Sequence, residues 1–203
     1  METPKLIDVT PFHPIVIKSH YDFDWKVLKP VCENLIKTTP RQVVLEEDNG
    51  KSSVYNKNSP HTMKEFKKFY EWLQPIVNHI IIDTWGYHPE IQYGPVQSWV
   101  NIHGKGGVTT EHAHGQSQLV VAAYFNLPAD GGYIEYRDPL EYQKLVHYRD
   151  KESEWKWNEV KAVTGDILIF PGWLIHRTQP SQSTEDRWVL TTNVAPLKPK
   201  SAI

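Results

Sequence analysis

Two histidines separated by one residue stand in the segment Glu111-His112-Ala113-His114-Gly115. Alternate side chains of an extended strand point to the same face, with Cα atoms about 6.6–6.8 Å apart. His112 and His114 are therefore expected to face one side together, where neutral imidazoles can bind a divalent metal ion. Because the chain has 10 histidines, a chance pair on the surface is the alternative interpretation.

A third histidine follows the apolar run Gly165-Asp-Ile-Leu-Ile-Phe-Pro-Gly-Trp-Leu-Ile. The glycine and proline positions predict turns on either side of a buried strand at 167–170, and His176 is expected to end the next short strand. A buried imidazole needs a partner. His176 is thus either a core histidine bonded to a backbone carbonyl or a further metal ligand.

An arginine opens the next predicted strand, Arg187-Trp-Val-Leu-Thr-Thr-Asn193. Alternation places Val189, Thr191 and Asn193 on the face of Arg187. An inward arginine on a largely apolar strand calls for an anion, and the planar guanidinium suits a carboxylate. The alternative is a solvated arginine that pairs with Glu185 or Asp186.

Taken in order, these elements resemble the iron(II)- and 2-oxoglutarate-dependent oxygenase superfamily, in particular its prolyl-hydroxylase-like branch. The pattern of that family is His-x-Asp/Glu, a strand like Tyr-Leu-Asn, Gly-Gly, Gly-x-hydrophobic-Phe, His and Arg. The matching residues, between Trp99 and Asn193, are His112-Ala-His114, Tyr124-Phe-Asn126, Gly131-Gly132, Gly165-Asp-Ile-Leu-Ile-Phe170, His176 and Arg187. The motif is also similar to that of small phage-encoded and bacterial members that carry His-x-His.

The resemblance implies a role for several individual residues. The implied Fe(II) ligands are His112, His114 and His176, and the implied cosubstrate-binding residues are Arg187, Tyr124, Asn101 and Asn126. Arg187 would hold the distal carboxylate of 2-oxoglutarate, with the hydroxyl of Tyr124 beside it. No catalytic residue is expected beyond this metal and cosubstrate site.

One position departs from the family pattern. His114 replaces the usual carboxylate ligand, so the protein would leave the charge of the iron uncompensated, and the dianionic cosubstrate would have to balance it. A bulge in the strand would bring Glu111 to the metal in place of His114.

The predicted activity is that of a dioxygenase that uses Fe(II), 2-oxoglutarate and O2 to hydroxylate a substrate, with release of succinate and carbon dioxide. A peptidyl proline is the substrate expected from the branch, and a free amino acid or small metabolite is the alternative. Two other classes stay open. One is a cupin-type metalloenzyme without a keto acid. The other is a non-catalytic β-sandwich module for binding or structure, because the many Trp residues would suit sugar stacking.

A β-rich region at 91–195 is expected to position these residues. Short β-branched and aromatic runs between turn residues predict strands at 96–103, 119–127, 133–136, 144–147, 159–163, 167–170, 174–176 and 188–194. Residues 1–90 are expected to be mainly helical support, with a strand at 15–18, helices at 23–37 and from 59 or 61 to about 84, and a loop at 45–60. The predicted fold is α+β, mainly β: a double-stranded β-helix (jelly-roll) core with an N-terminal helical layer in one domain, 1–203.

The composition of the chain limits the classes of binding partner that are expected. The 203 residues carry a net charge of −2 and are 39% hydrophobic, which is typical of a globular protein without a broad basic surface for nucleic acid or anionic membrane. The sequence contains no run of about 18 apolar residues, so it predicts no transmembrane helix. The single cysteine, Cys32, fits a reducing compartment, so the expected location is the cytoplasm, or the host cytoplasm for a phage protein. The expected partner is an unidentified peptide or small-molecule substrate.

Overall fold

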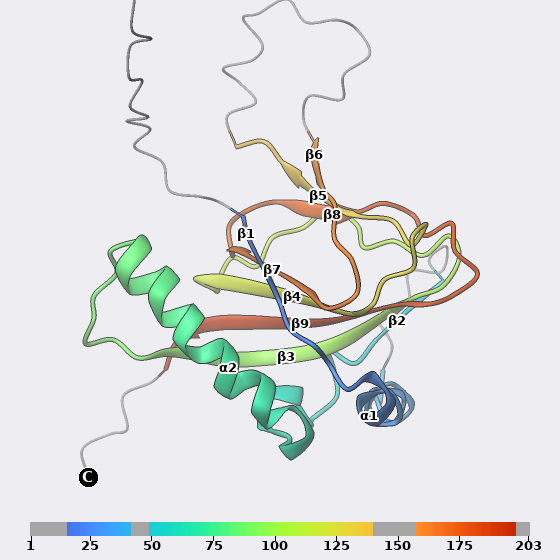
Figure 1. Ribbon diagram of the computed structural model, residues 1–203, viewed down its shortest axis with the longest axis horizontal. Helices are drawn as coiled ribbons and strands as arrows, with labels where there is room; N and C mark the ends of the chain where they lie inside the picture. Colours follow the sequence, from blue (N-terminus) through green and yellow to red (C-terminus); the bar gives the residue numbers. More distant parts are fainter. Residues whose placement is uncertain (1–15, 42–48, 140–156, 198–203) are drawn as a thin grey trace, which may run out of the picture.

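Two antiparallel sheets form the body of the molecule (Figure 1). The computed structural model describes residues 16–41, 49–139 and 157–197. The larger sheet has the strand order β1-β7-β4-β9-β3-β2, and the smaller sheet has the order β6-β5-β8. The strands are β1 (Ile17–His20), β2 (Gly50–Ser52), β3 (Tyr93–His103), β4 (Leu119–Asn126), β5 (Ile134–Arg137), β6 (Trp157–Val160), β7 (Asp166–Pro171), β8 (His176–Thr178) and β9 (Arg187–Pro196).

Helices cover one face of the larger sheet (Figure 1). They are α1 (Trp25–Lys37), the 3-10 turns η1 (Pro60–Thr62) and η2 (Lys64–Phe66), α2 (Lys67–Asn78) and the π-helical η3 (His79–Thr84). Asp24 caps α1, because its side chain accepts a hydrogen bond from Val27 N at 3.3 Å. In the described residues, no helix combines the length and apolarity that a membrane span requires.

Strand β4 divides its side chains between two cores. Val121, Ala123 and Phe125 pack with the helices. Val120, Ala122 and Tyr124 point to the other face, into a core shared with the smaller sheet. Burial on both faces explains why β4 is an almost uninterrupted apolar run rather than an alternating one.

The long helix predicted up to residue 84 is wrong as a continuous element. Met63 has an extended backbone, with φ −96° and ψ 140°, and it separates the two 3-10 turns, so the α-helix begins only at Lys67. At the other end the hydrogen bonds reach five residues back, as from Trp85 N to Ile80 O at 2.9 Å. The helical spacing predicted the apolar face correctly but not these two breaks.

The predicted loop at 45–60 contains β2, which pairs with β3 through Gly50↔His103 and Ser52↔Asn101. Gly-Lys-Ser has no strand-like pattern, so pairing with the long strand β3 determines its conformation. His176 begins strand β8, whereas the sequence predicted that it ends a strand. The strand predicted at 144–147 lies outside the described residues.

Candidate active site

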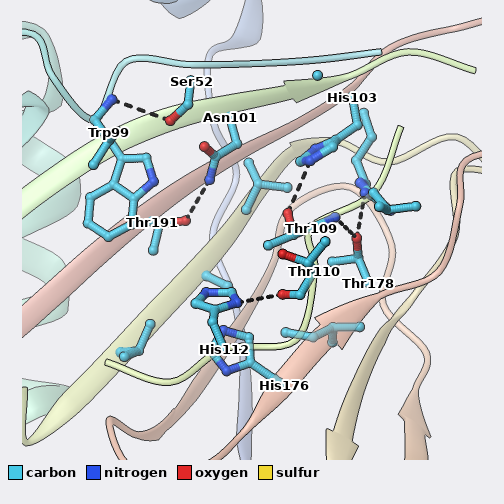
Figure 2. Close-up of a pocket in the computed structure, with 18 of the residues that line it drawn as sticks. Ser52, Trp99, Asn101, His103, Thr109, Thr110, His112, His176, Thr178 and Thr191 are labelled. Atoms are coloured by element: carbon cyan, nitrogen blue, oxygen red, sulfur yellow. Dashed lines mark hydrogen bonds between the residues drawn. The ribbon is translucent and has the colours of Figure 1, made fainter. Parts of the chain in front are cut away.

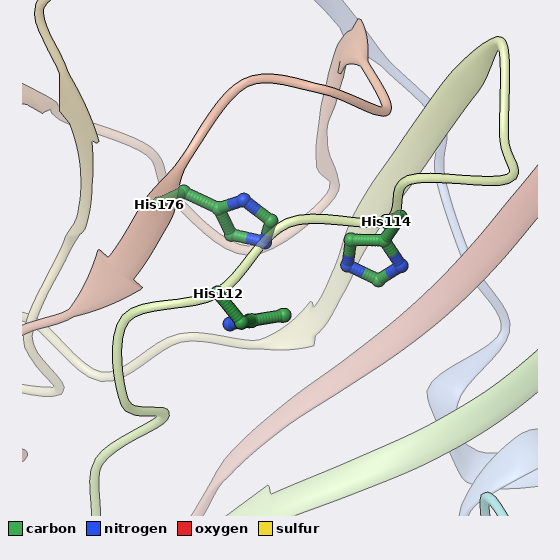
Figure 3. Close-up of side chains that lie close together, drawn as sticks. All are labelled: His112, His114 and His176. Atoms are coloured by element: carbon green, nitrogen blue, oxygen red, sulfur yellow. The ribbon is translucent and has the colours of Figure 1, made fainter.

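The imidazoles of His112, His114 and His176 face a common space (Figure 3). One nitrogen of each ring lies within 4.8 Å of those of the other two. The ring centroids are 4.3 Å apart for His112 and His176, and 5.0 Å apart for His112 and His114. Three imidazole nitrogens that converge in this way form a donor set suited to a divalent transition metal.

Backbone pairing brings the three histidines together. His112 and His176 form an isolated antiparallel bridge, in which each backbone N donates to the other's carbonyl oxygen at 3.0 Å. His114 N donates to Gly172 O at 2.7 Å. A Cβ at Gly172 would lie 2.0 Å from Ser117 O, so this approach requires a glycine. The predicted alternation of His112 and His114 is found, although the segment is a single bridge and not a regular strand.

Hydrogen bonds fix the tautomers of two of the rings. Nδ1 of His112 lies 2.8 Å from Thr110 O, and Nδ1 of His176 lies 2.9 Å from Leu174 O. A carbonyl oxygen only accepts, so each Nδ1 carries the proton and each Nε2 keeps the lone pair that a metal needs. Nε2 of His114 is buried and has no hydrogen-bond partner among the described residues. A bound metal would give this nitrogen its partner.

Burial keeps two of the three imidazoles, those of His114 and His176, uncharged. Desolvation, followed by the field of His112, lowers the pKa of His114 to about 4. The same two causes lower the pKa of His176 to about 3. Near pH 7 both imidazoles are therefore neutral and able to bind a cation.

Glu111 lies away from the cluster. Its carboxylate accepts a hydrogen bond from Arg137 Nη1 at 3.1 Å, and both side chains are partly exposed. The ring of His114 instead stacks on Trp99, with centroids 5.8 Å apart and an interplanar angle of 20°. The structure thus brings His114, and not Glu111, to the other two histidines.

A cavity of about 250 Å³ adjoins the histidines (Figure 2). Every second residue of three neighbouring strands lines it: Trp99, Asn101 and His103 of β3, Val120, Ala122 and Tyr124 of β4, and Arg187, Val189 and Thr191 of β9. Alternation along each strand therefore places Asn101, Tyr124 and Arg187 on one surface.

Arg187 lines this cavity from a buried position, with only 1% of its surface exposed. Its Nη1 donates to Gly131 O at 2.7 Å and to Gly132 O at 3.0 Å. The prediction that this arginine points inward is correct. The Gly131-Gly132 turn, which sequence reasoning gave no role, holds the guanidinium in place.

Tyr124 lies on the neighbouring strand and also lines the cavity. Burial raises the pKa of its hydroxyl to about 12, against the opposing effect of Arg187. The hydroxyl therefore stays protonated near pH 7 and can donate a hydrogen bond to an anion beside Arg187.

A chain of polar contacts extends from Arg187 to Thr178, Thr109 and His103, and Figure 2 labels the last three residues. Arg187 Nη2 donates to Thr178 Oγ1 at 3.0 Å, and Thr109 N donates to the same oxygen at 2.8 Å. Thr109 Oγ1 lies 3.1 Å from His103 Nε2. Sequence reasoning missed these three residues. For His103 a signal existed, because it follows Asn101 by two positions on the same strand face.

Of the two asparagines predicted to bind the cosubstrate, only Asn101 lines the cavity. Asn101 lines the cavity, and its Nδ2 donates to Thr191 Oγ1 at 3.2 Å. Asn126 is not among the residues that line it, and its predicted role in cosubstrate binding stays a prediction. A register irregularity between Tyr124 and Asn126 interrupts the alternation, and Asn126 Nδ2 donates to Asp186 O at 2.9 Å instead.

The segments predicted to border a substrate groove are only partly described. Gly50, Lys51 and Ser52 of β2, within the predicted loop at 45–60, do line the cavity. Most of the other predicted segment, 138–157, lies outside the described residues.

Comparison with known proteins agrees with this arrangement. Residues 97–193 match a family model described as "Putative 2OG-Fe(II) oxygenase". No curated protein matches the sequence. The matched segment contains all three histidines and Arg187, and the match supports the resemblance to the 2OG-Fe(II) oxygenase superfamily that the motif order predicted.

Solved structures share the fold. A prolyl-4-hydroxylase from Pseudomonas putida superposes with a TM-score of 0.63 at 11% identity, over 92% of this chain and 94% of that one. HygX from Streptomyces hygroscopicus, with nickel, 2-oxoglutarate and hygromycin B bound, gives a TM-score of 0.60 at 11% identity, over 89% and 82%. An oxidoreductase of the 2OG-Fe(II) oxygenase family from Burkholderia pseudomallei gives 0.56 at 11%, over 89% and 84%. The predicted fold class, a mainly β jelly roll with helices packed on it, is confirmed.

Proposed function

We propose that this protein is an Fe(II)- and 2-oxoglutarate-dependent dioxygenase, with iron bound by His112, His114 and His176. The observation that carries the proposal is that the histidine cluster and the buried Arg187 line one cavity. A neutral nitrogen donor set with a buried, unpartnered Nε2 fits a divalent metal. An arginine on the wall of the same cavity fits a carboxylate.

The cosubstrate would lie between the histidines and Arg187. Its distal carboxylate would accept hydrogen bonds from the guanidinium and from the Tyr124 hydroxyl, and Asn101 would contact it from β3. Arg187 is already oriented by Gly131 O and Gly132 O, so little side-chain freedom is lost on binding. This arrangement favours the 2-oxoglutarate enzyme over a cupin-type metalloenzyme without a keto acid or a non-catalytic module, neither of which requires an arginine here.

When bound, iron and 2-oxoglutarate together activate O2 for insertion of one oxygen atom into a C–H bond, as the cosubstrate becomes succinate and carbon dioxide. The protein holds these groups and limits the access of water. Apolar side chains of the cavity wall serve the second purpose: Val120, Phe170, Val189 and Ile134. No further acid or base from the chain is needed.

Hydroxylation is the reaction that we propose, and a peptidyl proline is the substrate that the prolyl-4-hydroxylase neighbour supports. Neighbours of similar score include HygX, solved with hygromycin B, and SnoK, a carbocyclase from nogalamycin biosynthesis. The choice between a peptide and a small molecule therefore depends on the residues around the cavity rather than on the fold.

The test is metal-dependent turnover of the cosubstrate in the absence of any prime substrate. Protein supplied with Fe(II), ascorbate, O2 and 2-oxoglutarate should form succinate slowly, and chelation of the metal should stop the reaction. The matched control is His79→Ala, an exposed histidine that contacts Asp83 on the helical side. It should behave as wild type, whereas His176→Ala should be inactive. Equal succinate formation by His176→Ala and wild type would exclude the proposed site.

A further inference from the structure

One ring of the histidine cluster lacks the backbone support that the other two have. His112 and His176 each donate Nδ1–H to a carbonyl oxygen two residues earlier. Among the described residues, the ring of His114 makes no such bond to a backbone carbonyl. Its Nε2 is buried without a partner, so some other group must hold the proton on Nδ1 if Nε2 is to bind a metal.

The polar group beside this ring is the side chain of Asn193. The ring of His114 stacks on Trp99, whose partner on β9 is Thr191, and Asn193 follows Thr191 by two positions on the same face of that strand. Nδ2 of Asn193 donates to Gln97 Oε1 at 3.4 Å, so Oδ1 points away from Gln97. This oxygen is buried and makes no hydrogen bond of normal geometry among the described residues. It is an acceptor in need of a donor.

We propose that Asn193 is the positioning residue of His114: its Oδ1 accepts the Nδ1–H, so that Nε2 presents its lone pair to the metal. The proposal rests on the proposed metal centre and adds a role to a residue outside the ligand set. This arrangement would give both buried atoms a partner, Oδ1 the Nδ1–H group and Nε2 the cation. Trp99, stacked on the imidazole, limits the ring to this orientation.

Strand β9 explains why an asparagine stands at this position. Asn193 shares a face with Arg187, Val189 and Thr191, and three of these residues line the cavity. The strand would thus serve both ends of the site, with Arg187 at the carboxylate end and Asn193 behind the third histidine. Thr192 points to the opposite face, where its hydroxyl lies 2.9 Å from the hydroxyl of Tyr70.

Three variants test the role of Asn193. Asn193→Leu removes the acceptor at nearly constant volume, and Asn193→Asp keeps an acceptor. Thr192→Val is the matched control, because it removes a buried hydrogen bond one residue away on the other face. Zn(II) or Co(II) affinity, measured by competition with a chelating dye, should fall about 10- to 100-fold in Asn193→Leu. It should stay near the wild-type value in Asn193→Asp and Thr192→Val. Equal affinity of wild type and Asn193→Leu would overturn the proposal.

Imidazole ¹⁵N NMR of the metal-free protein gives a second readout that a general loss of stability does not produce. Wild type and Asn193→Asp should show the Nδ1–H tautomer of His114, and Asn193→Leu should show a mixture or the Nε2–H tautomer. A wild-type ring that is mainly Nε2–H would overturn the role of Asn193 even if metal binds. Failure of the wild-type protein to bind any divalent metal, with His114 in the Nδ1–H form, would instead count against the proposed function.

Discussion

His103 and Arg187 are directly paired across the ladder of β3 and β9, and both line the cavity. Burial first, and the positive guanidinium second, lower the pKa of His103 to about 3. The folded protein thus keeps this imidazole neutral beside a buried cation, whereas the unfolded chain protonates it near the ordinary value of 6.5.

This pair predicts a loss of stability in acid. Below pH 6.5 the unfolded chain binds a proton on His103 that the folded chain does not bind until about pH 3, so the free energy of unfolding falls as the pH drops through that window. Urea unfolding of the metal-free protein between pH 7 and 4 should show it. His103→Gln should have a slope shallower by up to about 1.4 kcal/mol per pH unit. Parallel pH profiles for the variant and the wild type would mean that folding does not lower the pKa of His103.

Replacement of the arginine should affect both binding and stability. Arg187→Ala should raise the dissociation constant of 2-oxoglutarate roughly 10- to 100-fold, because a charged hydrogen bond contributes about 1.5–3 kcal/mol, while metal binding persists. It should also lower the free energy of unfolding by at least about 1 kcal/mol, because Gly131 O and Gly132 O lose their donor. Isothermal titration and urea unfolding measure the two effects. An unchanged 2-oxoglutarate affinity would place the anion site elsewhere.

Substitutions of two β4 residues, Tyr124 and Asn126, should have different effects on 2-oxoglutarate affinity. Tyr124→Phe removes a hydroxyl from the cavity wall and should weaken 2-oxoglutarate binding by about tenfold, without loss of metal affinity. Asn126→Ala removes the bond to Asp186 O outside the cavity, so it should cost stability and leave cosubstrate affinity unchanged. The same titration serves both variants. A larger loss of 2-oxoglutarate affinity in Asn126→Ala than in Tyr124→Phe would contradict the proposed cosubstrate site.

The third histidine should accept a carboxylate replacement. His114→Asp should keep metal binding and some turnover, because carboxylate is the usual occupant of this position in the superfamily that the motif resembles. His114→Ala should weaken metal binding by roughly a hundredfold or more. Metal titration of both variants, beside Glu111→Ala, separates the two candidate ligands. Strong loss in Glu111→Ala with full binding in His114→Ala would assign the position to Glu111.

Much of this site is predictable from strand alternation, and the features that the sequence did not predict have physical causes. Arg187 on β9 and Tyr124 on β4 follow their strand periods into the cavity, and His112 and His114 follow the same rule although they are not in a regular strand. Asn126 does not, because a register irregularity is invisible to a pattern of period two. The β2 strand was missed because it exists only through its pairing with β3. Asn193 was placed on the correct face, but its position beside His114 depends on the fold of a distant loop.

The most direct test of the central claim is a spectroscopic titration in the absence of oxygen. Metal-free protein is loaded with one equivalent of Fe(II), and 2-oxoglutarate is then added. We predict a weak visible charge-transfer band that appears only when both are present, that is lost in His176→Ala, and that requires a higher 2-oxoglutarate concentration in Arg187→Ala. A wild-type protein that binds Fe(II) but shows no band at saturating 2-oxoglutarate would contradict the central claim.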